Sequence, residues 1–264
     1  MELPDILFET RGPVATISFN RPERLNAFSP DLLTSALRAL EVVRKDPGLR
    51  VVVLTGVGRA FCAGADVKRI QEDRQSGAPD SLGFEQVQLA QNVLLALHQM
   101  PKPVIGAING VAAGAGFELS LGCDLRIAAE SAFFKEAAMG VGLVAGDGSA
   151  WFLPRLVGLA RAFEIFYLEE RISAARAAEI GLVNRVVPDD QFQEEVARLA
   201  DGLAAKPPLA LALTKQSIVD GLSRSLPETL VQLRQMVVAT LGTDDYVEGS
   251  NAIRDKRPAR FAGR

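Results

Sequence analysis

The apolar residues of this chain follow two spacings, and the change from one to the other divides the sequence. Before about residue 190, short β-branched runs alternate with helical repeats, whereas after Pro188 the spacing is helical throughout. The runs at 51–55 and 104–108 predict buried strands. We therefore expect an alternating α/β core over residues 1–190 and a helical region over residues 191–264.

Local signals predict further elements. Gly12 and Pro13 separate two strand-like runs and predict a hairpin. Ser29 followed by Pro30 predicts a helix start, because serine caps free N–H groups and proline suits the first turn. The polar segment 70–82, broken by glycine and proline, predicts a mobile loop over the site. In the helical region we expect helices over residues 191–205, 210–222 and 227–241, and a last short helix after them.

Residues 104–124 read VIGAINGVAAGAGFELSLGCD, a strand-like run followed by small residues and a helical segment. Glycine and alanine let another group approach the backbone closely. A helix that begins near Gly114 leaves N–H groups unpaired, and its positive dipole end suits an anion, including one that exists only in a transition state. Glu118 would lie one turn inside, where a carboxylate could transfer a proton. The alternative is that the small residues only allow tight helix–strand packing.

Residues 51–68, VVVLTGVGRAFCAGADVK, repeat this arrangement. A strand is followed by glycines and by the small-residue turn 63–65, after which Asp66 could cap a helical turn. Each unit places N–H groups beyond the C-terminal end of a strand. Together they supply the two converging donors that a thioester enolate oxygen requires.

Composition narrows the classes of function. The 264 residues are 48% hydrophobic and suit one large domain, and the net charge of −3 argues against nucleic acid as the main partner. The single histidine, His98, has no partners at metal-ligand spacing, so no metal site is predicted. Cys62 and Cys123 are expected to be small buried residues. No targeting segment or membrane span is apparent, so we expect a cytoplasmic protein.

Five segments resemble the enoyl-CoA hydratase/isomerase (crotonase) family, and they occur in order from about residue 6 to residue 261. They are FNRPERLNAF (19–28), AFCAGADV (60–67), KPVIGAINGVAAGAGFELSLGCD (102–124), RISAARAAEIGLVNRVVP (171–188) and EGSNAIRDKRPARF (248–261). The resemblance implies a crotonase-like α/β fold, a spiral of repeated ββα units with a C-terminal helical trimerisation region. It also implies an acyl-CoA substrate, no permanently bound cofactor, and a homotrimer or a dimer of trimers.

Matched residue by residue, the resemblance implies that the backbone N–H groups of Ala65 and Ala115 form an oxyanion hole. The second position is usually glycine in the family, but alanine keeps the N–H. Glu118 matches an acid/base residue. Other matched positions are expected to contact coenzyme A or the substrate, namely Arg24, Ala63, Asp66, Lys68, Gly114, Lys256 and Phe261.

The sequence departs from the family at the second acid/base of its hydratases, where Ala138 stands. Glu136 is two residues earlier, and in an extended segment it would share the face of Ala138 at a separation of about 7 Å. Some isomerases use an acid in the next segment, where Asp147 is offset by one position. Between two glycines, Asp147 could instead cap the following helix.

We therefore expect chemistry at the C=C bond of an acyl-CoA thioester. Hydration of a 2-enoyl-CoA comes first, because Glu118 matches the hydratase position. Double-bond isomerisation with Asp147 as a partner is the alternative. Hydrolysis or decarboxylation on the same oxyanion platform stays open, as does a catalytically silent acyl-CoA-binding protein.

Overall fold

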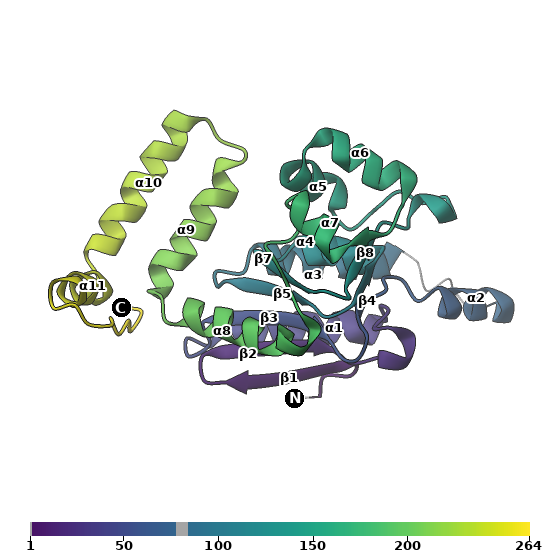
Figure 1. Cartoon of the computed structure of the whole chain (residues 1–264), viewed down its shortest axis with the longest axis horizontal. Helices are drawn as coiled ribbons and strands as arrows, with labels where there is room; N and C mark the ends of the chain where they lie inside the picture. Colours follow the sequence, from purple (N-terminus) through teal and green to yellow (C-terminus); the bar gives the residue numbers. More distant parts are fainter. Residues whose placement is uncertain (1, 78–83) are drawn as a thin grey trace.

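The computed structural model describes residues 2–77 and 84–264, and its core consists of two sheets whose strands alternate along the chain (Figure 1). The large sheet contains, in spatial order, β1 (Ile6–Arg11), β2 (Val14–Phe19), β3 (Val51–Gly56), β5 (Val104–Ile108), β7 (Leu125–Ala129) and β10 (Arg185–Val187). The small sheet contains β4 (Ala60–Cys62), β6 (Val111–Ala113), β8 (Phe133–Lys135) and β9 (Ile172–Ser173). Each pair β3/β4, β5/β6 and β7/β8 therefore gives one strand to each sheet, which is the repeated unit of the spiral.

The large sheet is covered on both faces. Its first two strands form the expected antiparallel hairpin, and its other strands pair in parallel. Val51–Leu54 of β3 are buried without alternation, as expected for a parallel strand with cover on both sides. Helix α1 (Pro30–Lys45) packs against β1, β2 and α3 (Phe84–His98), while α8 (Phe192–Ala204) packs across β2, β3, β5 and β7.

Two helix starts follow from capping side chains. The hydroxyl of Ser29 accepts the N–H of Leu32 at 3.0 Å, which confirms the predicted start of α1. Asp66 Oδ1 accepts the N–H of Arg69 at 3.2 Å and caps α2 (Val67–Ser76), as expected for Asp66. The expected loop over 70–82 is therefore wrong up to Ser76, because the helix that begins after Asp66 continues through this polar sequence. Residues 78–82 of that expected loop lie outside the described residues.

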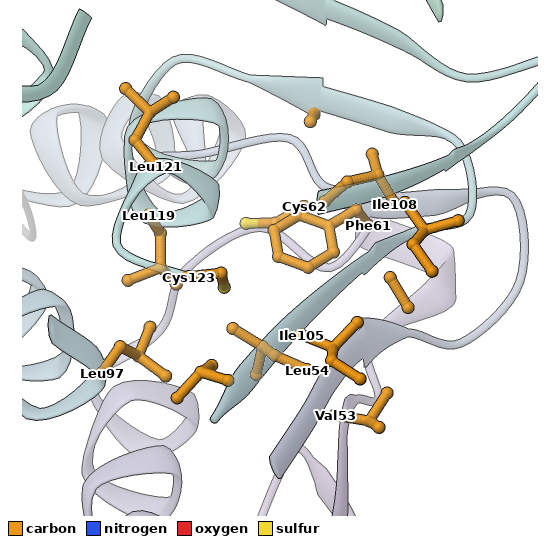
Figure 2. Packing of buried hydrophobic residues seen from close by; sticks show 14 of the residues in the cluster. Val53, Leu54, Phe61, Cys62, Leu97, Ile105, Ile108, Leu119, Leu121 and Cys123 are labelled. Carbon is orange, nitrogen blue, oxygen red and sulfur yellow. The ribbon is translucent and has the colours of Figure 1, made fainter. Parts of the chain in front are cut away.

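The apolar core between the sheets also contains α4 (Ala115–Leu121). Figure 2 shows Leu119 of α4 close to Cys123, with Phe61 and Cys62 of β4 and Ile105 of β5 in the same cluster. Both cysteines are free and buried, as predicted. Burial raises the pKa of each thiol to about 12, so neither is a thiolate at neutral pH.

The remaining helices lie in the second half of the chain. They are α5 (Ser149–Val157), α6 (Leu159–Leu168), α7 (Ala174–Glu179), α9 (Pro208–Gly221), α10 (Leu226–Leu241) and α11 (Asp244–Arg254). The expected helices after Pro188 are thus present. Helices α9 and α10 bury no residue within the chain, and Figure 1 shows them extending away from the sheets. The boundary between an α/β core (1–190) and a helical region (191–264) stays a prediction. Helix α8 belongs to the second region by sequence but packs on the large sheet of the first.

Candidate active site

Two strand–turn units meet at one end of the small sheet. Strands β4 and β6 pair in parallel, so the turns that follow them lie side by side. A Cβ atom on Gly64, which has φ +85°, would lie 2.7 Å from the Ala113 carbonyl oxygen and 2.9 Å from Ala115 N. A Cβ atom on Gly116 would lie 2.2 Å from the Cys62 carbonyl oxygen. Only glycine permits backbones to approach this closely, so both residues set the relative position of the turns.

The N–H groups of Ala65 and Ala115 occupy these turns. Gly114, at φ 49° and ψ −129°, precedes α4, and the first hydrogen bond of the helix runs from Glu118 N–H to the Gly114 carbonyl at 3.0 Å. The N–H of Ala115 therefore lies before the ladder of the helix. Within residues 2–77 and 84–264, neither the Ala65 nor the Ala115 N–H donates to a protein acceptor, and both residues are partly exposed.

Glu118 lies one turn into α4 and is held by the start of α5. Its Oε2 accepts three hydrogen bonds, from Asp147 N–H at 2.9 Å, Ser149 N–H at 3.1 Å and the Ser149 hydroxyl at 2.7 Å. The side chain is only 2% exposed. Burial raises the pKa of Glu118, and these three donors oppose that effect.

Two more carboxyl groups lie beside Glu118. Burial, followed by the negative charge of Glu118, raises the pKa of Glu136 to about 7. The same two causes raise the pKa of Asp147 to about 7. In the described part of the chain, Glu136 Oε2 and Asp147 Oδ1 are buried and have no hydrogen-bond partner. Such unpaired buried oxygens are costly, and they are typical of sites that bind or transfer protons.

Two expectations about these carboxyl groups are wrong. Gly148, with φ 100°, is the N-cap of α5 and no side chain caps it, so Asp147 is not the cap. The segment around Ala138 is not extended, because Ala138 has helical angles of φ −81° and ψ −42° and begins a 3₁₀ turn. Glu136 is therefore enclosed while Ala138 is partly exposed. The sequence reasoning did not single out Ser149, although its place after a glycine turn was a usable signal.

The arginines near Asp66 form a small ion-pair network. Arg21 lies 3.1 Å from Asp66 Oδ2, and Arg24 lies 3.7 Å from Asp66 Oδ1 and 3.8 Å from Glu72. Asp66 is buried and satisfied by these contacts, which indicates a structural role at the start of α2. Arg21 was missed as a partner of Asp66. Ala63 donates its N–H to the Leu25 carbonyl at 3.0 Å, and so holds the turn rather than offering a free donor.

The expected coenzyme A contacts are not all brought together in one chain. Lys68 is exposed on α2, near the site, whereas Lys256 follows α11. Figure 1 shows α2 and α11 at opposite ends of the molecule. Phe261 lies against Gly249 of α11, where a Cβ atom would be 3.4 Å from its ring. Lys256 and Phe261 are therefore not brought to the site of their own chain.

His98 has a packing role. Its ring meets Trp151 at 5.5 Å and Phe152 at 5.3 Å between centroids, both edge to face. Burial lowers its pKa and favours the neutral ring. Across the described residues there is no group of three His, Cys, Asp or Glu side chains arranged for a metal ion. In the same residues no helix is long and apolar enough to cross a membrane.

Comparison with known proteins matches this arrangement to one family. Residues 9–264 match the sequence profile described as enoyl-CoA hydratase/isomerase. The chain belongs to the enoyl-CoA hydratase/isomerase family. It is 39% identical over 259 residues to the 1,2-epoxyphenylacetyl-CoA isomerase of Escherichia coli K12, covering 98% of each chain. It is 34% identical over 267 residues to the crotonyl-CoA hydratase of Syntrophomonas wolfei, covering 99% of each.

Solved structures confirm the crotonase fold. An enoyl-CoA hydratase from Bacillus anthracis superposes with a TM-score of 0.93 at 37% identity, covering 98% of this chain and 100% of the other. A second, from Polaromonas, has a TM-score of 0.91 at 35% identity, covering 97% and 99%. The chain is thus an enzyme of a family of lyases and isomerases that act on enoyl-CoA thioesters.

Proposed function

We propose that this enzyme hydrates a 2-enoyl-CoA thioester at the site formed by Ala65, Ala115 and Glu118. The observation that carries the proposal is the position of Glu118 one turn beyond the Ala115 N–H, with three donors on its Oε2. A thioester carbonyl bound by the two backbone N–H groups would place its neighbouring carbons over this carboxyl group. The names of the hydratase relatives agree with this reaction.

The reaction puts negative charge on the thioester oxygen. Glu118 accepts a proton from water, and the hydroxide oxygen bonds to the β-carbon as the double bond opens. The electrons move to the carbonyl oxygen, where the N–H groups of Ala65 and Ala115 stabilise them, and each donor contributes ~3–4 kcal/mol. Glu118 then delivers the proton to the α-carbon, so the product contains one added water. Only the thioester, water and groups of this chain take part in this sequence, and no permanently bound cofactor is required.

Coenzyme A would be held by basic residues from two copies of the chain. Lys68 is exposed on α2. Arg24 pairs with Asp66, which lies just before that helix. Lys256 and Phe261 would come from a neighbouring copy, because they follow α11, which lies at the opposite end of the molecule from α2. Apolar side chains on α9, α10 and α11 support a homotrimer or a dimer of trimers. The exposed ones are Leu209, Ile218, Leu222, Leu226, Leu230, Val231, Val237, Val238, Leu241, Tyr246, Val247 and Ile253.

A second candidate reaction is double-bond isomerisation. It is favoured by Asp147, whose Oδ1 is buried without a partner in the described chain while its N–H holds Glu118. Of two carboxyl groups facing the substrate, one could remove a proton from the α-carbon while the other returns a proton to the γ-carbon, so that the double bond moves by one position. The name of the isomerase relative agrees with such chemistry.

Turnover of matched thioesters separates the candidates. Crotonyl-CoA and its saturated analogue butyryl-CoA would be tested for hydration, and a 3-enoyl-CoA of the same length for conversion to the 2-enoyl isomer. We expect loss of the enoyl absorbance and formation of 3-hydroxybutyryl-CoA. Conversion of the 3-enoyl-CoA without hydration would instead support isomerisation with Asp147. Binding of all three thioesters without turnover would overturn both reactions and favour a silent acyl-CoA-binding protein.

A further inference from the structure

Glu136 is more enclosed than the other two carboxyl groups of the site. Its side chain is fully buried, and it follows Lys135, whose carbonyl accepts the Gly114 N–H at 2.9 Å. The parallel register of β6 and β8 therefore places Glu136 beside Gly114, next to the Ala115 donor. Its Oε1 accepts the N–H of Ala137 at 3.0 Å, and its Oε2 has no partner among the described residues.

Hydrogen-bond donors are divided unequally between Glu136 and Glu118. Glu118 Oε2 takes three donors from the turn before α5, whereas Glu136 takes one from the next residue in the chain. Donors to a carboxylate favour its ionised form, and two neighbouring buried carboxyl groups resist ionising together. A proton shared by the pair therefore resides on Glu136.

We propose that Glu136 is a positioning residue that holds this shared proton, keeping Glu118 ionised as the base and keeping a second negative charge away from the oxyanion hole. The inference rests on the proposed function, in which Glu118 accepts a proton from water. Glu136 acts through Glu118, because its own side chain is enclosed by protein. It supplies the second carboxyl group of the site from a position two residues before Ala138.

The groups that face Glu136 come from three other elements. They are Glu118 of α4, the Ser149 hydroxyl at the start of α5, and Glu169 beyond the end of α6. Glu169 is itself held by the N–H groups of Met139 at 2.6 Å and Gly140 at 2.9 Å. In the described chain no lysine or arginine pairs with Glu136, so its ionisation would be uncompensated. An ionised Glu136 would then oppose the charge that develops on the thioester oxygen.

The pH dependence of turnover tests this role. Glu136→Gln keeps the size and the acceptor oxygen but cannot ionise. Because burial and the charge of Glu118 raise the pKa of Glu136 to about 7, wild-type activity should fall as Glu136 ionises. We expect the ratio of kcat/KM for Glu136→Gln to that of wild type to rise about tenfold between about pH 6 and about pH 8. The matched control is Glu130→Gln at an exposed position, which gives the baseline ratio.

Infrared spectroscopy provides a readout that does not depend on turnover. A protonated carboxyl group has a separate carbonyl band, which disappears on ionisation. We expect this band at neutral pH in wild type and in Asp147→Asn, where Asp147 no longer contributes. Glu136→Gln should lose part of it. In Asp147→Asn the band can come from Glu118 or Glu136 of this site, so its persistence in the double variant Asp147→Asn/Glu118→Gln would assign it to Glu136 even if Glu136→Gln does not fold.

Three results would overturn the proposal. One is a ratio that stays constant with pH, and another is a loss of at least 10²-fold at every pH in folded Glu136→Gln, which would make Glu136 a direct participant. The third is the absence of a protonated carboxyl band from Asp147→Asn at neutral pH. If wild type hydrates no enoyl-CoA, the proposed function fails, while the infrared measurement still decides where the proton resides.

Discussion

Asp147→Asn should make the protein more stable, and by an amount that depends on pH. The Asp147 side chain is 9% exposed, and its Oδ1 lacks a partner in the described residues. Asparagine has the same shape and keeps the backbone N–H that binds Glu118 at 2.9 Å. The substitution therefore removes a buried ionisable group while leaving the contact that orients Glu118.

The size of the effect follows from proton linkage. Burial, then the charge of Glu118, raises the pKa of Asp147 from 3.8 to about 7. A carboxyl group with a raised pKa contributes stability that is fully present below its unfolded pKa and is lost as pH rises through its folded pKa. The Asp147→Asn variant has no ionisable group at this position, so this position costs it no stability as pH rises. The free energy of unfolding of Asp147→Asn minus that of wild type should therefore grow between about pH 4 and about pH 7 and then stay level.

Above about pH 7 the difference in the free energy of unfolding should level off at about 4 kcal/mol, since one pKa unit corresponds to about 1.4 kcal/mol. Coupling to Glu118 and Glu136 spreads the rise over a wider pH range than a single group would give. Denaturant unfolding at fixed protein concentration would measure the difference at each pH, because assembly also contributes to stability. Asp190→Asn, which makes the same change at an exposed position, provides the baseline. A difference that is flat, or that falls as pH rises, would refute a buried and unpaired Asp147.

Four further substitutions and one measurement of size test the site and the assembly. Glu118→Gln should lower kcat for hydration by at least 10²-fold with the fold retained, measured by steady-state kinetics; turnover near the wild-type rate would remove Glu118 as acid/base. Ala115→Gly should be tolerated because the N–H remains, whereas folded Ala115→Pro should lose turnover because proline has no N–H; activity in that variant would exclude this donor. Lys256→Ala should raise KM for a CoA thioester but not for the matching pantetheine thioester, with Lys206→Ala as control; an equal effect on both would argue against a phosphate contact. Light scattering should give the mass of three or six copies, and a monomer at micromolar concentration would contradict the proposed assembly.

The sequence was most informative where local chemistry determines the structure. Strands β3 and β5 and the small-residue turns beyond them were predictable, because glycine and alanine act there mainly through the backbone. The short strands β4 and β6, which directly precede the two turns, were not predicted. The cap at Asp66 was predictable from the local sequence. Helix α2 continues to Ser76 through residues that were expected to form a loop, since polarity alone does not distinguish an exposed helix from an exposed loop.

The carboxyl cluster was only partly predictable, because it depends on contacts between distant segments. Ser149 binds Glu118 across 31 positions of sequence. The glycine turn before Ser149 indicates a helix start, but it does not indicate which distant residue that start contacts. Asp147 was expected to be a catalytic partner or a helix cap, and only the fold shows that Gly148 takes the cap position. In an extended segment Glu136 would lie about 7 Å from Ala138. In the fold the segment turns at Ala138, and Glu136 is fully buried facing Glu118, Ser149 and Glu169 from distant segments.

The site combines residues from successive turns of the spiral, and the turns contribute different groups: backbone N–H groups from the first two and carboxyl groups from the last two. Ala65 follows β4, Ala115 and Glu118 follow β6, and Glu136 and Asp147 follow β8. The backbone donors depend on close packing at Gly64 and Gly116, which tolerates little change. In the segment 136–149 the closest contact of a Cβ atom on Gly148 would be with a side-chain atom, Leu94 Cδ2 at 2.5 Å, rather than with backbone. A lineage built on this scaffold can therefore change the fate of the proton by altering that one segment, while inheriting intact the means of polarising a thioester.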